Sequence, residues 1–306
     1  MVKSDTGVCA IVVIYRPDPV LLRELLDAVT PQVDQVVVVD NTPLEAADRN
    51  PAISSKAVVL DQGGNLGLAA AQNVGIDWAR QHGFRHVLLL DQDSTPGEGM
   101  VASLLDALAR LGQAGPVAAV GPRFHDLRGD RDAPFVRLGF PFNRKLWCER
   151  EGQVVACDFL ISSGALIPMA ALDAIGPMDA GLFIDNVDLE WSFRARARGF
   201  SLYGVCAATM HHRLGDARHA LPLRLGKVVV HGPVRLYYMM RNRVRLYRMP
   251  HTPGIWVAQD VPRLLVKLFL FGVLIGPRPR NLRFMLRGLA DGVRGHAGPC
   301  PLQTGT

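Results

Sequence analysis

Residues 86–96 read His86-Val87-Leu88-Leu89-Leu90-Asp91-Gln92-Asp93-Ser94-Thr95-Pro96, a short apolar run that ends in two carboxylates. A bounded run rich in Leu and Val is typical of a buried strand in a parallel sheet. Ligands of open α/β sheets bind just beyond the carboxyl ends of such strands. Asp91 and Asp93 are therefore expected at the mouth of a cleft, where two carboxylates repel each other unless a cation or a proton offsets their charge. Oxygen ligands of this kind suit Mg²⁺ or Mn²⁺ bound together with substrate phosphates, so the stretch predicts a metal–diphosphate site.

Two other interpretations of the same stretch stay open. A solvated acidic turn after a strand has the same pattern, and D-x-D-x-T is also the motif of phosphohydrolases in which the first Asp is the nucleophile. A phosphohydrolase of that class would need a Ser or Thr at the end of the next strand and a Lys before a second acidic motif. The next strand ends Val120-Gly121-Pro122, and no Lys lies between Asp93 and Lys145, so the sequence disfavours this alternative.

The segments around residues 86–96 alternate between the patterns of strands and helices, which predicts an α/β fold with a mostly parallel central sheet flanked by helices. Right-handed crossovers place the ends of such strands on one edge of the sheet, where Asp40, Asn65, Asp91 and Asp93 would converge. Residues 121–157 lack the alternation and are expected to be irregular. The other expected strands are Val8–Tyr15, Gln35–Asp40, Ala57–Asp61, Val117–Val120 and Ser201–Val205, and the expected helices lie at about Pro19–Val29, Ala69–Gln81, Met100–Leu111 and Ala170–Ile175.

The composition is that of a globular protein. With 306 residues, 49% of them hydrophobic and 20% charged, the chain can hold one large domain, or a domain and an appendage. The first apolar run, Val8–Ile14, meets Arg16 and Pro17 at once, so it is a strand and not a secretory signal. The five cysteines show no metal-like spacing, and we expect them to be reduced thiols in a cytoplasmic protein.

The net charge of +6 is spread unevenly along the chain. Residues 213–294 contain 16 Lys and Arg against 3 Asp and Glu, a net of +13 that leaves −7 for the remainder. A basic region of this kind is expected to meet something anionic. Nucleic acid is a poor fit, because the aromatic residues there, Tyr237 and Tyr238, are few and lie among apolar neighbours.

Leu264–Ile275 is an apolar run inside this basic region, interrupted by Lys267. It is too short to cross a bilayer, which needs about 20 residues. The run therefore predicts either a buried core helix or an interfacial helix flanked by arginines. The surrounding excess of Arg favours contact with a membrane surface.

Two further segments contribute candidate site residues. Residues 182–194 hold a second concentration of acidic side chains, and Asp185 or Asn186 there can cap a helix that stops at Gly199. His212 follows the last expected strand, where a histidine is either a surface feature or a third ligand for an ion at the first acidic stretch.

Asp188 lies in the first turn of the helix predicted after residue 186, where the helix dipole favours a carboxylate that stays ionised. Trp191 follows on the same helix face, and a base beside an aromatic ring suits a sugar hydroxyl. An ordinary N-terminal helix carboxylate is the alternative interpretation. Glu190 and Arg194, four residues apart, predict a structural ion pair.

The order and spacing of several motifs resemble the inverting family-2 glycosyltransferases of GT-A fold and, within them, the bacterial rhamnosyltransferases of the O-antigen, core-oligosaccharide and rhamnolipid pathways. The resemblance covers Val8 to about Tyr247, most of the chain. Each motif alone is weak, and the combination is specific. The motifs are Tyr15-Arg16-Pro17, Asp40-Asn41-Thr42, Asn65-Leu66-Gly67-Leu68-Ala69-Ala70-Ala71-Gln72-Asn73-Val74-Gly75, Leu90-Asp91-Gln92-Asp93-Ser94, Phe159-Leu160-Ile161-Ser162-Ser163-Gly164, Phe183-Ile184-Asp185-Asn186-Val187-Asp188-Leu189-Glu190-Trp191 and Tyr237-Tyr238-Met239-Met240-Arg241-Asn242.

This resemblance implies a role for each candidate site residue. Asp188 occupies the position of the catalytic base. Many members of the family read Glu-Asp there, whereas this chain reads Val187-Asp188, so Asp188 is the sole candidate base at that position. The implied nucleotide-sugar-binding residues are Tyr15, Asp40, Asn65, Gly67, Asp91 and Gln92, the acceptor-binding residues are Ser163, Gly164 and Trp191, and the metal ligands are Asp91, Asp93 and His212.

The implied reaction moves L-rhamnose from dTDP-L-rhamnose to a glycan or glycolipid acceptor in one inverting displacement, assisted by Mg²⁺ or Mn²⁺ and an aspartate base. The implied organisation is a nucleotide-sugar-binding half at residues 1–122, an acceptor-binding and catalytic-base half of the same domain at 123–215, and a helical, basic C-terminal extension at 216–306. We expect the protein to lie peripherally on the inner face of the cytoplasmic membrane. A non-catalytic nucleotide-sugar-binding protein of the same fold is the alternative, disfavoured because binding alone needs no base.

Overall fold

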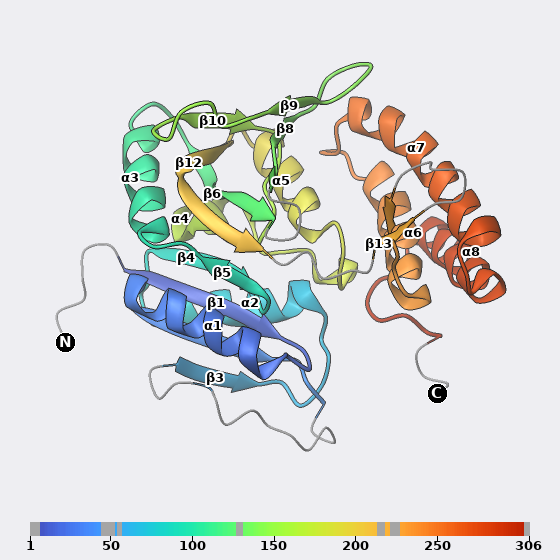
Figure 1. Cartoon of the computed structure of the whole chain (residues 1–306), viewed down its shortest axis with the longest axis horizontal. Helices are drawn as coiled ribbons and strands as arrows, with labels where there is room; N and C mark the ends of the chain where they lie inside the picture. The colour runs from blue at the N-terminus through green and yellow to red at the C-terminus, as the bar shows by residue number, and fades with distance from the viewer. Residues whose placement is uncertain are drawn as a thin grey trace. The chain divides into compact units, whose positions relative to one another are not determined.

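The chain folds into two compact units. The computed structural model describes residues 7–43, 53, 57–126, 131–212, 218–220 and 227–302. The first unit, here the sheet unit, comprises Met1–Ala180 and Val187–Arg213. The second, the helical unit, comprises Gly181–Asn186 and Leu214–Thr306. Figure 1 labels the helices and strands of both.

A ten-stranded sheet with the order β10-β12-β6-β11-β4-β1-β2-β3 is the centre of the sheet unit, and β5 and β7 pair with β12 and β6 (Figure 1). β1 to β4 run parallel to one another, as do β6 and β12, whereas β11 lies antiparallel between β4 and β6. The expected α/β fold with a mostly parallel sheet is therefore confirmed. The strands are β1 Val8–Ile14, β2 Gln35–Asp40, β3 Ala57–Asp61, β4 His86–Asp91, β5 Ser94–Pro96, β6 Val117–Asp126, β7 Arg131–Asp132, β10 Val154–Cys157, β11 Leu166–Pro168 and β12 Ser201–His212.

Helices cover both faces of this sheet, and alternate residues of each strand point to opposite faces. Leu88 and Leu90 of β4 belong to the apolar cluster that α1 and α3 complete. Leu89 and Asp91 alternate with them, so they lie on the opposite face. The helices of the sheet unit are α1 Pro19–Val29, α2 Leu68–Gln81, α3 Met100–Gly112, α4 Met169–Ile175 and α5 Val187–Ala197, with short 3₁₀ turns at Thr30–Gln32 and Ala180–Leu182.

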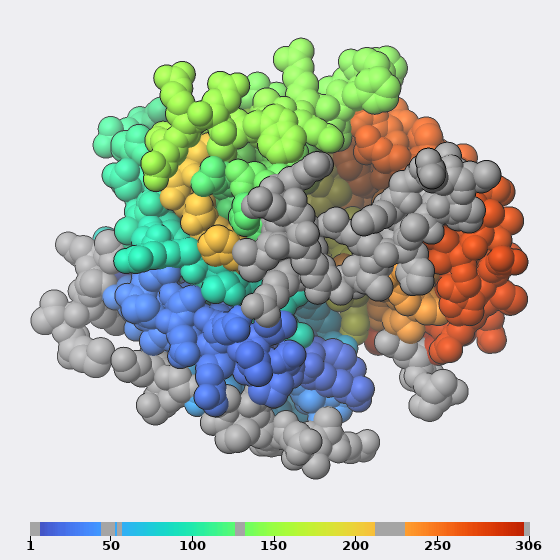
Figure 2. All heavy atoms as spheres, in the orientation of Figure 1, coloured from blue at the N-terminus to red at the C-terminus, as the bar shows by residue number. Residues whose placement is uncertain are grey.

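The expectation of an irregular region at residues 121–157 is wrong in part. β6 continues to Asp126, and β8 (Phe135–Arg137) pairs with β9 (Arg144–Leu146) in a separate hairpin. This hairpin forms the lime projection along the upper edge of Figure 2. Its connection exposes two aromatic side chains, Phe140 and Phe142, each 79% exposed. Apolar residues at the surface thus lie in a segment that hydrophobic periodicity could not assign.

The described part of the helical unit contains three long helices. α6 and α8 pack closely, because α8 presents glycines to the α6 backbone. A Cβ on Gly288 would collide with the carbonyl oxygen of Tyr237, and one on Gly292 would lie 2.8 Å from that of Arg241. The elements are α6 Pro233–Tyr247, α7 Gly254–Phe269, the π-helical turn η4 Leu270–Leu274 and α8 Arg278–Arg294, with the strand pair β13 Arg218–Ala220 and β14 Lys227–Val229.

Two fully buried polar side chains of α6, Arg241 and Asn242, hold the segment 181–186. Phe183, Asp185 and Asn186 in this segment have positive φ values of 66°, 64° and 62°, a left-handed conformation that is unfavourable for residues other than glycine. The two side chains fix it through its carbonyl groups. Arg241 donates to Gly181 (3.1 Å) and Leu182 (2.8 Å), and Asn242 Nδ2 donates to Leu182 (2.9 Å), Ile184 (2.7 Å) and Asp185 (2.8 Å).

The cysteine expectation is wrong for two of the five residues. Cys148 and Cys206 form a disulfide across 58 positions of sequence, with Cα atoms 5.6 Å apart. Cys9, Cys157 and Cys300 are free thiols and buried, as expected of reduced cysteines. The pairing depends on where β12 carries Cys206 in the tertiary fold, which the spacing of cysteines along the chain does not reveal.

None of the described helices has the length and apolar character needed to cross a membrane.

Candidate active site

The carboxyl ends of β1, β2 and β4 lie together at one edge of the sheet. Ile14 of β1 stands opposite Asp40 of β2, and Val13 stands opposite Asp91 of β4. The structure therefore brings Asp40 and Asp91 to either side of the strand that ends before Tyr15. This is the arrangement predicted from right-handed crossovers.

Gln92 fixes the backbone of Tyr15 at this edge. The Tyr15 N–H donates to Gln92 Oε1 at 2.8 Å, and Gln92 Nε2 donates to the Tyr15 carbonyl at 3.4 Å. The phenol ring stays 41% exposed. An exposed aromatic ring on a clamped backbone is a pre-positioned surface for stacking a planar ligand.

The loop after β2 is shaped by its own side chains. Asp40 Oδ1 accepts the Thr42 N–H at 2.8 Å, and Thr42 Oγ1 accepts the Arg16 N–H at 3.0 Å. Asn41, which is 2% exposed, donates to the Gly67 carbonyl at 3.2 Å. These bonds join the ends of β1 and β2 to the loop before α2.

That second loop turns on Asn65 and Gly67. Asn65 Oδ1 accepts the Gly67 N–H at 2.9 Å, an Asx turn made by a short polar side chain. Gly67 has φ of 85°, in the region that only glycine adopts at little cost. The loop thereby brings Asn65 to the surface next to the β2 end. α2 begins at Leu68, directly after Gly67.

Ser163 supports the turn of the two aspartates. The Asp91 N–H donates to Ser163 Oγ at 3.0 Å, and Ser163 Oγ donates to Ser94 Oγ at 2.9 Å. Gly164 has φ of +78°, and a Cβ there would lie 2.6 Å from Pro122. Its N–H donates to the Leu89 carbonyl at 2.6 Å, so the Ser163–Gly164 pair braces β4 up to its last residue.

The donor set at this turn fits a hard divalent cation. Asp91 and Asp93 supply carboxylate oxygens, and Mg²⁺ is commonly held by one or two carboxylates together with substrate phosphates. Among the described residues, no group of three or more His, Cys, Asp or Glu side chains gathers as a metal site. The backbone of His212 pairs with Ser94, next to Asp93, and its side chain lies outside the described part.

Asp188 lies on the same side of the sheet as Asp91. It lines a small cavity together with Leu89 of β4, Ser162 and Trp191. Leu89 and Asp91 share one face of β4 by alternation. Within the sheet unit, Asp188 therefore lies beside the Ser162–Ser163 segment, on the sheet face that also carries Asp91.

α5 is anchored by its own side chains, which fixes where Asp188 lies. Arg194 binds both carboxylate oxygens of Glu190 at 2.8 Å, which confirms the predicted ion pair. Its guanidinium also donates to the carbonyls of Ile175 (2.9 Å) and Pro177 (2.8 Å). The Trp191 indole N–H donates to the Gly176 carbonyl at 3.0 Å. Glu190 is committed to Arg194, and Asp188 is the carboxylate of this helix that lines the cavity.

The predicted bounds of this helix agree closely with those of α5 in the structure. α5 begins at Val187, directly after Asn186, and Gly199 has φ of +83° just past its end, as expected of a helix stop. The expected cap is not of the ordinary kind, because Asp185 and Asn186 are left-handed rather than extended. Asp185 instead pairs with Arg235 at 3.3 Å.

The residues assigned to the acceptor all have internal partners. Ser163 is 1% exposed and Trp191 3% exposed, and Gly164 is also buried. Ile161, at 47%, is the exposed side chain of the same segment. An acceptor-binding role for Ser163, Gly164 and Trp191 stays a prediction.

The sequence patterns did not predict two interactions that support the site. Asn73 of α2 forms a reciprocal pair of hydrogen bonds with the backbone of Met178, each 2.9 Å long. Ser94, which is fully buried, accepts a hydrogen bond from the Ser163 hydroxyl. The partners are 105 and 69 positions apart, so no local pattern could reveal them.

Comparison with known proteins gives a consistent class. The model of Glycosyl transferase family 2 matches residues 9–169. The chain is 28% identical to dTDP-rhamnosyl transferase RfbF of Shigella flexneri over 298 residues, 96% of this chain and 98% of that protein. Its structure is similar to GalNAc-T7 with UDP, GalNAc and Mn²⁺, with a TM-score of 0.57 and 12% identity over 92% of this chain and 55% of the other. It is also similar to S. aureus TarS, with a TM-score of 0.54 and 16% identity over 94% of this chain and 49% of the other.

A mostly parallel sheet flanked by helices, with polar strand ends gathered at one edge, has the GT-A fold of nucleotide-sugar-dependent glycosyltransferases. The chain belongs to Glycosyl transferase family 2 and is a glycosyltransferase. The matched residues run from β1 to the start of α4 and include the edge formed by Tyr15, Asp40 and Asp91. This assignment sets aside the phosphohydrolase interpretation of D-x-D-x-T.

Proposed function

We propose that this glycosyltransferase moves L-rhamnose from dTDP-L-rhamnose to a hydroxyl group of a glycan or glycolipid, with inversion at the anomeric carbon. The observation that carries the donor is the similarity over nearly the full length to a protein named dTDP-rhamnosyl transferase. A single displacement on a β-linked donor gives an α-rhamnoside. No covalent intermediate is required.

Asp188 is the proposed general base. It accepts the proton of the acceptor hydroxyl as the oxygen attacks the sugar from the face opposite the leaving diphosphate. Its place in the first turn of α5 favours the ionised carboxylate that a base requires. The anchoring of α5 through Arg194 and Trp191 supports this role, because a base must be held in position.

The nucleotide is proposed to lie at the edge formed by β1 and β2. The exposed ring of Tyr15 stacks on the thymine base, and the Asp40 carboxylate accepts its N–H. Asn65 and Gly67 close the pocket on the other side. Asp91 and Gln92 lie toward the ribose and diphosphate, and the bonds of Gln92 to the Tyr15 backbone would tie those two regions together.

Asp91 and Asp93 are the proposed holders of Mg²⁺ or Mn²⁺, with His212 as a further ligand. When bound there, the ion supplies Lewis-acid stabilisation to the departing diphosphate. The chain's own part is to present carboxylate oxygens on a turn that Ser163 and Ser94 brace from behind. The solved structure of GalNAc-T7, which has the same fold, contains UDP, GalNAc and Mn²⁺, and this supports the choice of a divalent cation.

The acceptor is proposed to enter beside the cavity of Asp188, next to the segment of Ser163 and Gly164. Trp191 and Ser163 would form the wall of that region rather than its exposed surface. A binding protein without activity would not need a carboxylate at this place. The position of Asp188 therefore favours the transferase over a non-catalytic nucleotide-sugar-binding protein.

We further propose a peripheral contact with the inner face of the cytoplasmic membrane. α7 and η4 expose an apolar stripe at four-residue spacing, formed by Val261 (40% exposed), Leu265 (58%), Phe269 (56%) and Val273 (50%). Residues repeating every four positions lie on one helix face. α8 of the same unit also exposes several arginines, which suit an anionic surface (Arg278, Arg280, Arg283 and Arg294).

A nucleotide-sugar panel tests the donor. Purified protein is incubated with Mn²⁺ and dTDP-L-rhamnose, dTDP-D-glucose, UDP-glucose or UDP-N-acetylglucosamine, and both thermal shift and release of the nucleoside diphosphate are measured. We expect dTDP-L-rhamnose to give the largest shift and the fastest metal-dependent release. Preference for a UDP-sugar would contradict the donor assignment and leave the family unchanged.

A further inference from the structure

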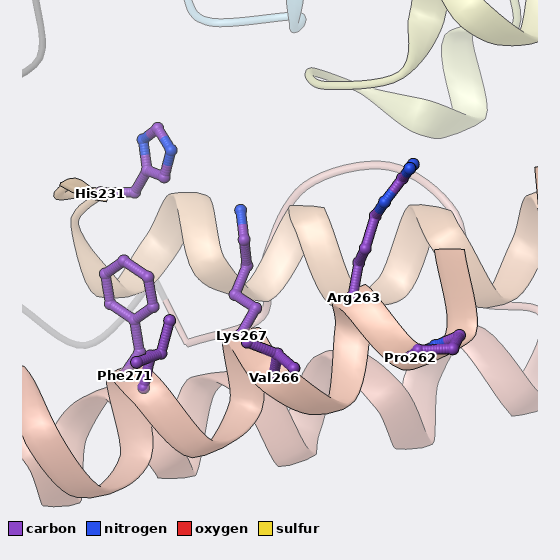
Figure 3. Close-up of a pocket in the computed structure, with 7 residues that line it drawn as sticks. His231, Pro262, Arg263, Val266, Lys267 and Phe271 are labelled. Atoms are coloured by element: carbon purple, nitrogen blue, oxygen red, sulfur yellow. The ribbon is translucent and has the colours of Figure 1, made fainter. Parts of the chain in front are cut away.

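The helical unit contains a cavity that no step of the proposed reaction uses. Its volume is about 390 Å³, within the range of pockets for small ligands. Figure 3 shows Arg263 and Lys267 rising from the same side of α7, with His231 at one end of the row. Its remaining walls are apolar and are formed by Pro262, Val266, Leu270 and Phe271.

The two carboxylates whose charge acts on Lys267, Asp260 and Asp185, are already engaged. Asp260 accepts a hydrogen bond from the Tyr247 hydroxyl at 2.7 Å and pairs with Arg243 at 3.3 Å. Asp185 pairs with Arg235 at 3.3 Å. In the described part of the chain, Lys267 and Arg263 form no ion pair within 4.0 Å of their own. The cavity therefore keeps an excess of positive charge.

Lys267 has a weak partner for a partly buried cation. Its Nζ donates to the thioether sulfur of Met239 at 3.7 Å, and a thioether is a poor acceptor. Burial, together with the charge of Arg243, lowers the pKa of Lys267 to about 8, against the attraction of Asp185 and Asp260. An anion in the cavity would offset this burial cost.

We infer that this cavity binds the phosphate end of a membrane lipid, with Arg263 and Lys267 on the phosphate and the lipid chain against Val266 and Phe271. A guanidinium binds a phosphate through two parallel hydrogen bonds, and the adjacent ammonium adds a point charge. Residues 263 and 267 are one helical turn apart, so both reach one phosphate group. His231 lies at the Phe271 end, where its ring centroid is 6.5 Å from that of Phe271.

The combination of charge and apolar wall selects this occupant. Inorganic phosphate would leave the apolar wall in water, and a neutral lipid would leave Arg263 and Lys267 without an anionic partner. An anionic amphiphile satisfies both. The inference rests on the proposed membrane contact for the source of the lipid, and it assigns a bound lipid molecule to one defined place.

Titration with dihexanoyl phosphatidic acid, below its micelle concentration, tests the inference without a bilayer. Dihexanoylglycerol is the matched probe, because it lacks only the phosphate, and inorganic phosphate is the matched anion. Calorimetry with the full chain is expected to show saturable binding of the phosphatidic acid at one site. The other two probes are expected to bind at least about tenfold more weakly, because dihexanoylglycerol lacks the phosphate that Arg263 and Lys267 would bind and inorganic phosphate lacks the chains that would cover the apolar wall.

Three variants make the outcome specific. Lys267→Gln and Arg263→Gln are each expected to weaken binding of the phosphatidic acid about tenfold or more. Arg283→Gln removes the same charge from an exposed position of α8 outside the cavity and is expected to leave binding unchanged. Thermal unfolding confirms that each variant is folded.

Absence of saturable binding, or equal loss in all three variants, would overturn the inference. Equal binding of inorganic phosphate and phosphatidic acid would overturn the lipid assignment in favour of a simple anion site. Donor release by the same variants is measured separately. Loss of lipid binding with normal release of the nucleotide separates failure of this inference from failure of the proposed transferase activity.

Discussion

The backbone N–H of Asp91 donates a hydrogen bond to Ser163 Oγ at 3.0 Å, across 72 positions of sequence. The Ser163 hydroxyl in turn donates a hydrogen bond to Ser94 Oγ, so one hydroxyl joins both sides of the turn that carries the two aspartates. The F-L-I-S-S-G motif therefore acts on the D-Q-D-S motif from behind. The same segment continues through Ser162 to the cavity of Asp188.

Replacing this hydroxyl should loosen the turn. Ser163→Ala removes a buried acceptor from the Asp91 N–H and a donor from Ser94, and we expect a loss of about 1–3 kcal/mol in the free energy of unfolding. Weaker Mn²⁺-dependent binding of dTDP should accompany it. Urea unfolding and calorimetry measure the two effects, with Ser162→Ala as the neighbouring control. A Ser163→Ala protein as stable as wild type would show that the brace is unimportant.

The metal site has its own test. Asp93→Ala removes one of two carboxylates proposed to hold the cation, and the remaining donors bind a divalent ion more weakly. We expect Mn²⁺ binding in the presence of dTDP to weaken at least about tenfold, with the unfolding midpoint little changed because Asp93 is partly exposed. Electron paramagnetic resonance of free Mn²⁺ reports the binding. Equal binding by wild type and variant would count against the site.

The α6–α8 contact depends on a missing side chain. Gly288→Ala would push a methyl group into the carbonyl oxygen of Tyr237, and overpacking of this kind costs about 1–3 kcal/mol. Gly254→Ala is the matched control, because no atom lies within 4 Å of the Cβ it would add. Thermal unfolding should show a lower midpoint for Gly288→Ala than for wild type and an unchanged midpoint for Gly254→Ala. Equal midpoints for the two variants would contradict the close packing of α6 against α8 at Gly288.

Lys267 gives a pH dependence of stability with a definite sign. Its pKa is lowered to about 8 from an ordinary 10.5, so the unfolded chain binds more protons than the native one between these values. Stability therefore rises with pH in that window. Lys267→Met removes this slope, and we expect the wild-type-minus-variant difference in unfolding free energy to increase from pH 7.5 to pH 9.5. Buried tyrosines with a raised pKa act at higher pH and cancel in the difference. A flat difference would contradict the burial of this ammonium.

Sequence patterns were sufficient for the elements whose burial is regular. β2, β3 and α1 have the predicted bounds, because a continuous apolar run or a 3.6-residue period fixes them, and Pro19 begins α1 behind an Asp18 cap. β12 was predicted to end at Val205 and instead reaches His212. Its register shifts after Val205, and an irregular strand loses the two-residue period on which the prediction rested.

The candidate site divides in the same way. Asp40 and Asp91 were placed correctly because strand ends in a parallel sheet share one edge. The support of those residues was not foreseen. Ser163 under Asp91, Asn73 with Met178 and the Cys148–Cys206 bond join segments that are distant in sequence, and only the packed structure brings them together.

The most direct test of the account is metal-dependent hydrolysis of dTDP-L-rhamnose by the Asp188→Asn protein, with dTDP affinity measured in parallel. A positioned general base contributes about 10²–10⁴-fold, so turnover should fall by that factor while dTDP affinity and the unfolding midpoint stay as in wild type. Asp185→Asn, three residues earlier and paired with Arg235, is the control and should retain turnover. Near-wild-type turnover in Asp188→Asn would contradict the assignment of the base.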